Sequence, residues 1–401
     1  MDCKKYNAME HYLHTINQRY IALSEEEEIR NNAILRVVVE PIIQKMQEKD
    51  KLFKKLYKDM FFGGSYYDGL KIGSPNEYDL DLLLKFPPPC ETEICNINEV
   101  DIYTSNKPGF VNLYLRNRNG FGNLCEFWQA YLDIPKLLSW MEGVIQKALN
   151  DFNEDRSWYI FQNLYSQKYY VKVYKQGPAF TLIIRGENLG QLVNLSIDLV
   201  PCFSFDYSRW PKNGFKPNPF SYNTDMSDFF VVPKYPKGVP NYGGRYWRLS
   251  FQKQERYLIH NKGRLKPALK LLKKMRDTMN SNQISSYYLK TVVLWDAEKQ
   301  DPNFWLCNSL SYVFMYILKT YQKCLSDKKI PYFWNKKYNL LESVSGDLNN
   351  MSNRLKYIID DIDRNVSQNP AVVLKYVLTP DEQKALFPEV PIEESSWCSL
   401  L

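Results

Sequence analysis

The residues with the clearest chemical potential lie between positions 63 and 79. The turn-like sequence Gly63-Gly64-Ser65 is separated by eleven residues from Glu77 and Asp79. Glycines let a backbone approach a polyphosphate closely, and a serine hydroxyl with neighbouring turn amides can donate hydrogen bonds to phosphate oxygens. Two carboxylates spaced i, i+2 project from the same face of a β-strand, where they can share divalent cations. The arrangement predicts chemistry on nucleoside triphosphates.

A third carboxylate would complete a two-metal site, and Asp198 is the candidate. It lies in the apolar segment LVNLSIDLVP, where an unpaired charge would be costly unless it met a cation. In such a site one ion activates an attacking hydroxyl and the other stabilises leaving pyrophosphate. Asp81 shares the strand face of Glu77 and Asp79, so Asp79 with Asp81 is a second possible metal pair. Each feature alone has an ordinary structural explanation, but their order and spacing together favour a nucleotidyltransferase.

The elements that carry these residues predict an α+β fold with a mixed sheet. Ser24 and Glu27 form a capping box, after which one apolar stripe predicts a long spine helix of about 35 residues. Pro41 lies inside it and predicts a kink near 37–41. Acidic and apolar residues alternate over 77–84, which indicates a strand. Similar reasoning predicts a helix over 135–152 and strands over 169–174, 179–185 and 191–200.

The second half of the chain has a different pattern. Six prolines lie between 206 and 246, which predicts a connecting segment and places the domain boundary near 205. We therefore expect a nucleotidyltransferase core with the spine helix over 1–205 and an all-helical lobe over 206–401 that completes the nucleotide pocket. Helical periodicity supports this division over 247–261, 264–279, 283–297, 303–325, 343–366 and 380–387.

Composition limits the class of protein. The 401 residues are 44% hydrophobic and 24% charged, which is typical of a folded globular protein and excludes a disordered or collagenous chain. The net charge of +7 is compatible with a polyanionic partner. The eight cysteines show no disulfide framework or zinc spacing, and no segment resembles a membrane span or signal peptide. We expect a protein of the reducing cytoplasm.

Several motifs together resemble one family. The segments 62–67 (FGGSYY), 71–79 (KIGSPNEYD), 246–251 (YWRLSF), 269–273 (LKLLK) and 285–291 (SSYYLKT) occur in the order seen in the cyclic GMP-AMP synthase-like receptors of animal innate immunity. These receptors belong to the polymerase-β-like nucleotidyltransferases. The resemblance covers most of residues 20–400, and it implies the bilobed fold already expected from the patterning.

The resemblance also implies roles for single residues. Glu77, Asp79 and Asp198 would hold two Mg²⁺ or Mn²⁺ ions, which selects Glu77 with Asp79 as the strand pair and leaves Asp81 a supporting position. ATP and GTP would be joined into cyclic GMP-AMP with release of pyrophosphate, and Asp198 would serve as base or hydroxyl-activating ligand. The remaining nucleotide contacts implied are Gly64 and Ser65 to triphosphate, Lys273 and Ser285 to the donor triphosphate, Arg248 to a guanine edge or phosphate, and Tyr287 stacked on a base.

The activating ligand is predicted to be a nucleic acid. The vertebrate DNA-sensing enzyme of this family has a zinc-binding insertion, but the matching region between His260 and Leu269 contains no cysteine, so no structural zinc is expected. Loss of this element resembles the invertebrate receptors, which favours double-stranded RNA over double-stranded DNA, with a possible dimer on the nucleic acid. Two basic clusters could bind a phosphate backbone if they share one surface: Lys51, Lys54, Lys55 and Lys58, and Lys262, Arg264 and Lys266 with Lys270, Lys274 and Arg276.

Two alternative functions remain open at this point. One is a synthetase of linear 2′-5′ oligoadenylates on the same core, and the other is a catalytically silent nucleic-acid-binding scaffold. Separately, Cys398-Ser399-Leu400-Leu401 matches a prenylation signal that would take geranylgeranyl, but the upstream Glu393-Glu394 is acidic where a basic stretch would help, which favours an ordinary tail. The linkage of the product does not follow from the sequence.

Overall fold

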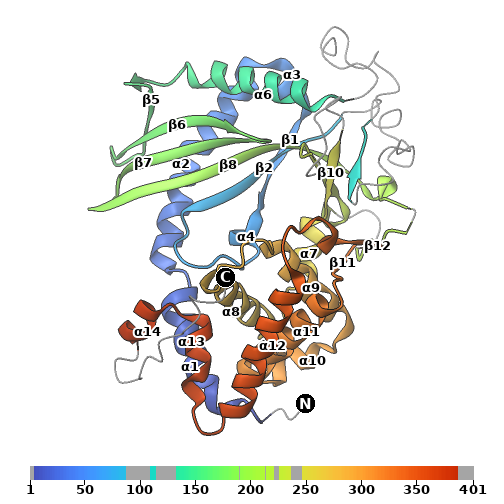
Figure 1. Ribbon diagram of the computed structural model, residues 1–401. Coiled ribbons are helices and arrows are strands. Elements are labelled where there is room, and N and C mark those ends of the chain that lie inside the picture. The colour runs from blue at the N-terminus through green and yellow to red at the C-terminus, as the bar shows by residue number, and fades with distance from the viewer. Residues whose placement is uncertain are drawn as a thin grey trace. The chain divides into compact units, whose positions relative to one another are not determined.

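The chain divides into two compact units. The computed structural model describes residues 4–86, 109–113, 132–188, 190–212, 214–220, 225–235 and 246–386. The sheet unit comprises Leu23–Gly69 and Ser74–Tyr257, and the helical unit comprises Met1–Ala22, Leu70–Gly73 and Leu258–Leu401 (Figure 1). The expected α+β class, with a sheet-bearing core and a helical lobe, is confirmed. The tail from Cys398 onward lies outside the described residues.

Ten of the strands found in the described residues form one mixed sheet. Their order is β3-β10-β9-β8-β7-β6-β5-β4, with β2 pairing with both β8 and β1 (Figure 1). β2 runs parallel to β8, whereas the other pairs are antiparallel. The strands are β1 (Tyr57–Gly63), β2 (Glu77–Leu84), β3 (Phe110–Val111), β4 (Glu154–Asp155), β5 (Trp158–Gln162), β6 (Lys168–Gln176), β7 (Ala179–Asn188), β8 (Gln191–Phe205), β9 (Phe229–Val232) and β10 (Trp247–Ser250).

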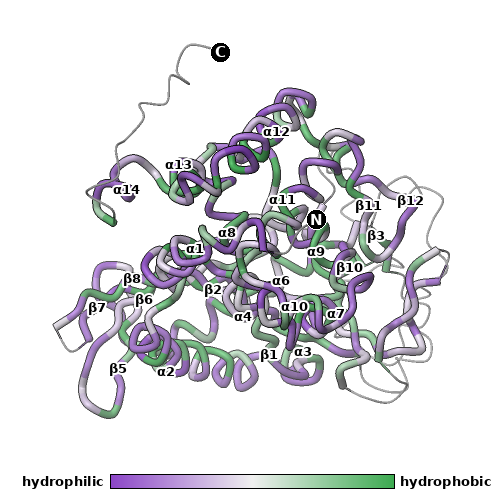
Figure 2. The backbone as a smooth tube through the Cα atoms, turned by 90° about the horizontal axis from the view of Figure 1, so that it is seen from below, coloured by the Kyte–Doolittle hydropathy of each residue, from purple (hydrophilic) through white to green (hydrophobic). Residues whose placement is uncertain are grey.

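One face of this sheet is buried and the other carries polar residues. The buried face includes Leu182 and Ile184 of β7 and Ile197 and Leu199 of β8, all of which are fully buried. Helices α2 (Glu25–Lys49) and α6 (Ile134–Leu149) pack on each other and supply apolar stripes, and Figure 1 shows α2 crossing the sheet. Figure 2 shows apolar and polar stretches alternating along the elements, as expected where each element buries one face.

The predicted spine helix is shorter than expected because it breaks at Asp50. α2 begins after Ser24, whose hydroxyl accepts the Glu27 N–H at 3.4 Å, and continues through Pro41 to Lys49. Asp50 is extended and caps a second helix, α3 (Lys51–Leu56), by accepting the Phe53 N–H at 2.8 Å. The apolar stripe therefore spans two helices, because the spacing of buried residues continues across a short interruption.

The boundary expected near 205 differs from the division in the structure. β8 continues to Phe205, and β9 and β10 then extend the same sheet, so the sheet unit ends at Tyr257. The expected helix over 247–261 is a strand up to Ser250, followed by α7 (Gln252–Leu258). The pairing partners of these short strands lie far away in the sequence, so no local periodicity marks them.

The helical unit is built from both ends of the chain. Fully buried apolar residues of α8 and α11 form its core, and one short hairpin accompanies the helices, so the lobe is not purely helical. Its elements are η1 (Asn7–Met9), α1 (Glu10–Ile16), η2 (Asn17–Ile21), α8 (Leu265–Thr278), α9 (Ser286–Lys299), α10 (Pro302–Cys307), α11 (Leu310–Ser326), β11 (Pro331–Tyr332), β12 (Asn335–Asn339), η7 (Leu340–Ser343), α12 (Leu348–Asn365), η8 (Pro370–Val373), α13 (Leu374–Val377) and α14 (Pro380–Leu386).

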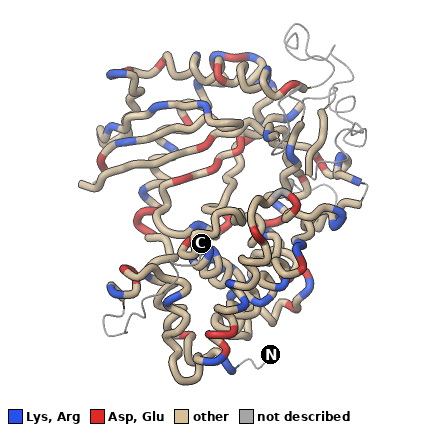
Figure 3. The backbone as a smooth tube through the Cα atoms, viewed as in Figure 1, with Lys and Arg blue, Asp and Glu red and all other residues tan. Residues whose placement is uncertain are grey.

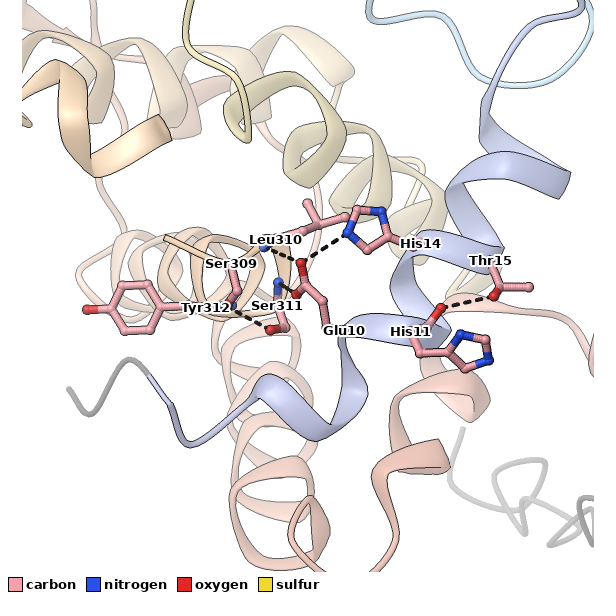
Figure 4. Close-up of polar contacts among 8 residues, drawn as sticks. All are labelled: Glu10, His11, His14, Thr15, Ser309, Leu310, Ser311 and Tyr312. Atoms are coloured by element: carbon pink, nitrogen blue, oxygen red, sulfur yellow. Dashed lines mark hydrogen bonds and ion pairs between the residues drawn. The ribbon is translucent and has the colours of Figure 1, made fainter. Parts of the chain in front are cut away.

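Glu10 joins the N-terminal segment to α11. Its carboxylate accepts the N–H groups of Leu310 at 2.9 Å and Ser311 at 2.6 Å, and His14 Nε2 lies 3.1 Å from the same carboxylate (Figure 4). Burial alone would raise the pKa of Glu10, but the hydrogen bonds from Ser311 and Leu310 outweigh it and hold that pKa below its ordinary value. A negative charge at the start of a helix stabilises it, so Glu10 anchors the first helix of the chain to a late one.

A capping box is present at the start of α14. The Thr379 N–H donates to Glu382 Oε2 at 2.8 Å, and the Glu382 N–H donates to Thr379 Oγ1 at 3.4 Å. Glu382 also pairs with Lys274 at 2.5 Å. Among the helices that the structure describes, none is long and apolar enough to cross a membrane.

Candidate active site

Glu77 and Asp79 lie on the exposed face of β2. The strand alternates as predicted, with Glu77 and Asp79 exposed and Tyr78 and Leu80 buried on the opposite face. The start of the strand is fixed by the Pro75 carbonyl, which accepts the Tyr78 hydroxyl at 2.6 Å. Buried partners hold the backbone, so the two acidic side chains are presented from a rigid strand.

The loop before β2 is held from the spine helix as well. Asn31, a buried polar residue of α2, donates from Nδ2 to the Pro75 carbonyl at 2.8 Å. One carbonyl thus receives hydrogen bonds from a helix and from the strand that it precedes. This arrangement fixes where β2 begins, and therefore which residues face the exposed side.

Asp198 lies beside Asp79 on the neighbouring strand. In the parallel pairing of β2 with β8, Asp79 is the register partner of Asp198, so both side chains leave the same face of the sheet. On the other side of β8, Asp198 is opposite Thr181, whose hydroxyl donates to Asp198 Oδ1 at 2.6 Å. Figure 3 shows acidic residues where β2 and β8 run side by side. The register places Asp79 beside Asp198, with Glu77 two residues earlier on the same face of β2.

The carboxylates of Glu77, Asp79 and Asp198 are suitable ligands for hard divalent cations, but their side chains do not converge on one metal position. Carboxylate oxygens are the ligands that Mg²⁺ prefers. Throughout the described ranges, no group of three or more histidine, cysteine, aspartate or glutamate side chains is placed closely enough to hold a metal ion. Glu77, Asp79 and Asp198 therefore fit a metal site in residue type and strand position, and side-chain rotation would be needed to converge on an ion.

The Gly63-Gly64-Ser65 turn lies in close contact with β2, the strand that carries Glu77 and Asp79. β1 ends at Gly63, the register partner of Asp79, and the short helix α4 (Gly64–Tyr67) begins at once. Gly64 has a φ of +72°, and a Cβ there would lie 1.8 Å from Asp79 Oδ2. A side chain at this position would collide with the carboxylate. Glycine is required here for close approach as well as for its left-handed backbone.

A residue that the sequence did not single out contacts the turn. The Gly64 N–H donates to Gln252 Oε1 at 3.2 Å, and a Cβ at Gly63 would lie 2.6 Å from the same oxygen. The Gly64 amide, which was expected to meet triphosphate, is therefore already hydrogen-bonded within the protein. No motif marks Gln252, because its role depends on a contact between segments 188 positions apart. Ser65 is half-buried at the next position.

Asp81 lies beneath the exposed carboxylates and is engaged by the protein. It is 5% exposed, and its Oδ2 accepts Gln252 Nε2 at 2.7 Å. Burial raises the pKa of Asp81 to about 6, although the Cys202 thiol, the Gln252 amide and the positive charge of Arg248 oppose the rise. These contacts fit the supporting position expected for Asp81, as distinct from the alternative in which it forms a metal pair with Asp79.

Arg248 is carried by β10 in the same unit. Its register partners are Val232 of β9 and Phe110 of β3, and the side chain is half-buried. Burial raises the pKa of Asp81 and that of the Cys202 thiol, and the positive charge of Arg248 opposes both rises. The neighbouring Trp247 is fully buried and fixes the strand.

Lys273, Ser285 and Tyr287 belong to the helical unit. Lys273 is buried on α8 and donates to the Leu70 carbonyl at 2.5 Å. Burial lowers the pKa of Lys273 to about 8, and the nearby charge of Arg276 adds to the effect. Ser285 is the N-cap of α9 without a side-chain capping bond, and Tyr287 is half-buried in the first turn.

The two predicted basic clusters belong to different units. Lys51, Lys54 and Lys55 are exposed on α3, and Lys58 follows on β1, where it pairs with Asp228 at 2.9 Å. Lys262, Arg264 and Lys266 belong to the helical unit and are only half-exposed. Burial lowers the pKa of Lys262. A single surface shared by both clusters stays a prediction, and the α3 cluster is the more accessible one.

Comparison with known proteins agrees with these observations. Residues 66–261 match the Mab-21 protein nucleotidyltransferase domain, and residues 264–357 match the Mab-21 protein HhH/H2TH-like domain. A cyclic GMP-AMP synthase-like receptor of Aethina tumida is 45% identical over 397 residues, covering 95% of this chain and 94% of the relative. A second, of Tribolium castaneum, is 39% identical over 416 aligned positions, covering 98% of this chain and 100% of the relative.

The sequence comparisons and the geometry of the site point to the same strands. The matched nucleotidyltransferase domain contains β2, β8 and β10, the strands that present the acidic face and Arg248, and it ends just after α7. The relatives match along nearly the whole length of both units. The chain therefore belongs to the cyclic GMP-AMP synthase-like receptor family and carries its nucleotidyltransferase domain.

Proposed function

We propose that the chain joins ATP and GTP into cyclic GMP-AMP as an innate immune second messenger, and that double-stranded RNA activates it. The observation that carries the proposal is the parallel register of Asp79 with Asp198, directly beside the Gly64 turn. That geometry supports nucleotidyl transfer on a triphosphate. The name of the relatives supports the choice of product, and the motifs of the family support the choice of substrates.

The carboxylates would do the central chemistry. Glu77, Asp79 and Asp198 would hold two Mg²⁺ or Mn²⁺ ions, which when bound activate the attacking ribose hydroxyl and neutralise charge on the departing pyrophosphate. Thr181 occupies Oδ1 of Asp198 at 2.6 Å. This leaves Oδ2 to accept the hydroxyl proton or to ligate a cation. The proton would leave as the ribose oxygen forms its bond to the α-phosphorus, with the second reaction closing the ring in the same way.

The remaining site residues would bind and orient the nucleotides. Ser65 would donate to phosphate oxygens from the start of α4, and Arg248 offers a bidentate fork to a guanine edge or phosphate. Ser285, whose hydroxyl makes no capping bond, would donate to the donor triphosphate. Tyr287 would stack on a base, since an aromatic ring supplies a stacking face for any base. The Gly64 contribution would be steric, because its amide is used by Gln252.

Lys273 would change partners when a triphosphate binds. Its ammonium now donates to the Leu70 carbonyl, and burial lowers its pKa to about 8. A phosphate chain nearby would favour the charged form of the lysine and raise that pKa again. Lys273 would then exchange a neutral carbonyl for an anionic oxygen. The segment Leu70–Gly73 would lose this hydrogen bond in the same step.

The nucleic-acid contact proposed is electrostatic. Lys51, Lys54 and Lys55 are exposed and spaced along one helix, as suits a phosphate backbone, and Lys58, Lys262, Arg264 and Lys266 would extend the contact. A-form RNA would be recognised by shape and 2′-hydroxyl groups. Two copies bound to one duplex would form a dimer. The cytoplasm is the proposed compartment, in keeping with the free thiols of Cys202, Cys307 and Cys324.

Product analysis tests the proposal. Purified protein would be incubated with labelled ATP, GTP and Mn²⁺, with no nucleic acid, double-stranded RNA or double-stranded DNA. We expect a cyclic product only with RNA, and none from Glu77→Ala/Asp79→Ala. A matched control is Glu154→Ala/Asp155→Ala, which removes an exposed acidic pair from β4 of the same sheet. Product from ATP alone would indicate a linear oligoadenylate synthetase, and tight duplex binding without any product would indicate a silent scaffold.

A further inference from the structure

The side chain of Gln252 connects the glycine turn to the strand that carries the acidic residues. It is the first residue of α7, and its Oε1 accepts the Gly64 N–H at 3.2 Å. Its Nε2 donates to Asp81 Oδ2 at 2.7 Å and to Ser250 Oγ at 3.2 Å. Both ends of one amide group are therefore used, one toward the turn and the other toward β2.

The two contacts determine which way this amide points. The Gly64 N–H can only donate, so the amide oxygen has to face Gly64, and the amide nitrogen is left to donate to Asp81 Oδ2. Asp81 is buried and shares the strand face of Asp79, which lies two residues earlier on β2. The result is a chain of contacts from Asp81 through Gln252 to the Gly64 amide, anchored in the same strand as the acidic site.

The glycine pair makes room for this contact. A Cβ at position 63 would lie 2.6 Å from Gln252 Oε1, and a Cβ at position 64 would lie 1.8 Å from Asp79 Oδ2. The first glycine thus admits the glutamine, and the second admits the carboxylate. Movement of the turn away from Gln252 would change its spacing from Asp79, because the turn is in close contact with both.

The same helix holds the two flanks of the turn. Arg256, one helical turn after Gln252, donates from Nη2 to the Phe62 carbonyl at 2.6 Å and from Nε to Asp68 Oδ1 at 3.0 Å. Phe62 precedes the glycine pair, and Asp68 follows α4. α7 therefore contacts the turn before, at and after Gly64, with Gln252 at the centre.

We propose that Gln252 is a positioning residue for nucleotidyl transfer: hydrogen-bonded to Asp81, it holds the Gly63-Gly64-Ser65 turn at its distance from Asp79. The inference rests on the proposed function for its catalytic consequence. Its structural part, the protection of the Gly64 amide, stands on the hydrogen bonds alone. Gln252 itself does not touch the reacting atoms in this role.

A pair of glutamines on α7 provides a matched test. Gln252→Leu removes the contact, and Gln254→Leu removes a second buried amide from the same helix, one that donates to the carbonyls of Met226 at 3.1 Å and Asp228 at 2.9 Å, away from the turn. Three quantities would be measured for each: hydrogen exchange in the peptide 62–68, the melting temperature, and kcat and KM for product formation.

The expected pattern separates positioning from general stability. Gln252→Leu should accelerate exchange in the turn peptide at least tenfold and lower kcat on the order of 10²-fold, as misplacement by about 1 Å does elsewhere, with a smaller change in KM. Gln254→Leu should lower the melting temperature about as much as Gln252→Leu does, but it should leave hydrogen exchange in the turn peptide and kcat close to the wild-type values. Equal losses of kcat in both variants, or unchanged turn exchange in Gln252→Leu, would overturn the inference.

Exchanging the amide of Gln252 with the carboxylate of Asp81 should restore activity that a single substitution removes. Gln252→Glu places two carboxylates together and should lower kcat as strongly as Gln252→Leu. In Gln252→Glu/Asp81→Asn the amide and the carboxylate have swapped places, so the amide at position 81 donates to the carboxylate at position 252, which still accepts the Gly64 N–H. The kcat should then return to within about tenfold of wild type, the non-additivity expected of residues in contact. Failure of the swap to restore either kcat or turn protection would count against the pairing.

The two proposals fail in different ways. Absence of product from the wild-type protein under every activating condition would refute the proposed function. Hydrogen exchange needs no substrate, so the comparison of Gln252→Leu with Gln254→Leu would still decide whether Gln252 holds the turn. A wild-type enzyme that is active, with a Gln252→Leu variant equally active, would refute the inference and leave the proposed function intact.

Discussion

The close approach of Gly64 to Asp79 makes the Gly64→Ala variant informative. An alanine Cβ would lie 1.8 Å from Asp79 Oδ2, whereas ordinary contacts begin at 3.4 Å, so the carboxylate would have to withdraw by at least about 1.6 Å. Alanine would also adopt a φ of +72°, which costs about 1–2 kcal/mol in the left-handed region. If Asp79 holds the metal ions as proposed, a displacement of that size predicts a loss of kcat on the order of 10²-fold.

Gly73 supplies the control for this experiment. Its φ is +76°, and an added Cβ would have no atom within 4 Å. Gly73→Ala therefore has the same unfavourable left-handed backbone conformation as Gly64→Ala but no steric collision. Urea unfolding should show a loss of about 1–2 kcal/mol for Gly73→Ala, and a loss of at least that size for Gly64→Ala, where the collision adds to the backbone cost. Product formation should fall only in Gly64→Ala. Equal activity of the two variants, or a Gly64→Ala enzyme with more than half of the wild-type rate, would refute the assignment of Gly64 to a steric role beside Asp79.

Three further predictions follow from single contacts. Thr181→Val removes the hydroxyl that donates to Asp198 at 2.6 Å, and kcat should fall about tenfold with unchanged melting temperature; an unchanged kcat would contradict this. Burial raises the pKa of Asp296 from 3.8 to about 6, so the wild-type protein loses stability as the pH rises through that range. Relative to wild type, the unfolding free energy of Asp296→Asn should therefore increase by about 2–3 kcal/mol between pH 4 and pH 8. Urea titrations in which the two proteins show the same dependence of stability on pH would contradict this prediction. Glu10→Gln should lower the stability of the helical unit by about 1–2 kcal/mol at pH 7. Because the pKa of Glu10 is lowered, this difference should disappear as pH falls below the ordinary glutamate range, and a difference that persists there would argue against an electrostatic cause.

The strand that carries the acidic pair was predictable because its signal is local. Glu77 to Asp81 alternate acidic and apolar residues, and the structure has a strand from Glu77 to Leu84. β1 was not predicted, because its residues directly follow the apolar stripe of the preceding helices. Asp50 interrupts the spine helix with a cap that the periodicity of its neighbours conceals.

Long-range pairing explains what the sequence left undetermined in the site. Asp198 could be proposed from its apolar surroundings, but its register with Asp79 depends on a parallel pairing between strands more than 100 residues apart. Gln252 carries no pattern at all, since its importance comes from the Gly64 amide and the Asp81 carboxylate that it joins. The strands β9 and β10, which lie beyond the boundary predicted near 205, went unpredicted for the same reason, because they are recognised only by their partners in the sheet.

The contact of Glu10 with α11 has a consequence for the order in which the protein is made. The apolar face of α1, with Leu13 and Ile16 fully buried, has to wait for the partner helix ending at Ser326, about 300 residues later. At 5–20 residues per second this amounts to roughly 15–60 s of translation. The sheet unit can assemble on the ribosome during that interval, while the apolar face of α1 stays accessible to chaperones until α11 has been synthesised.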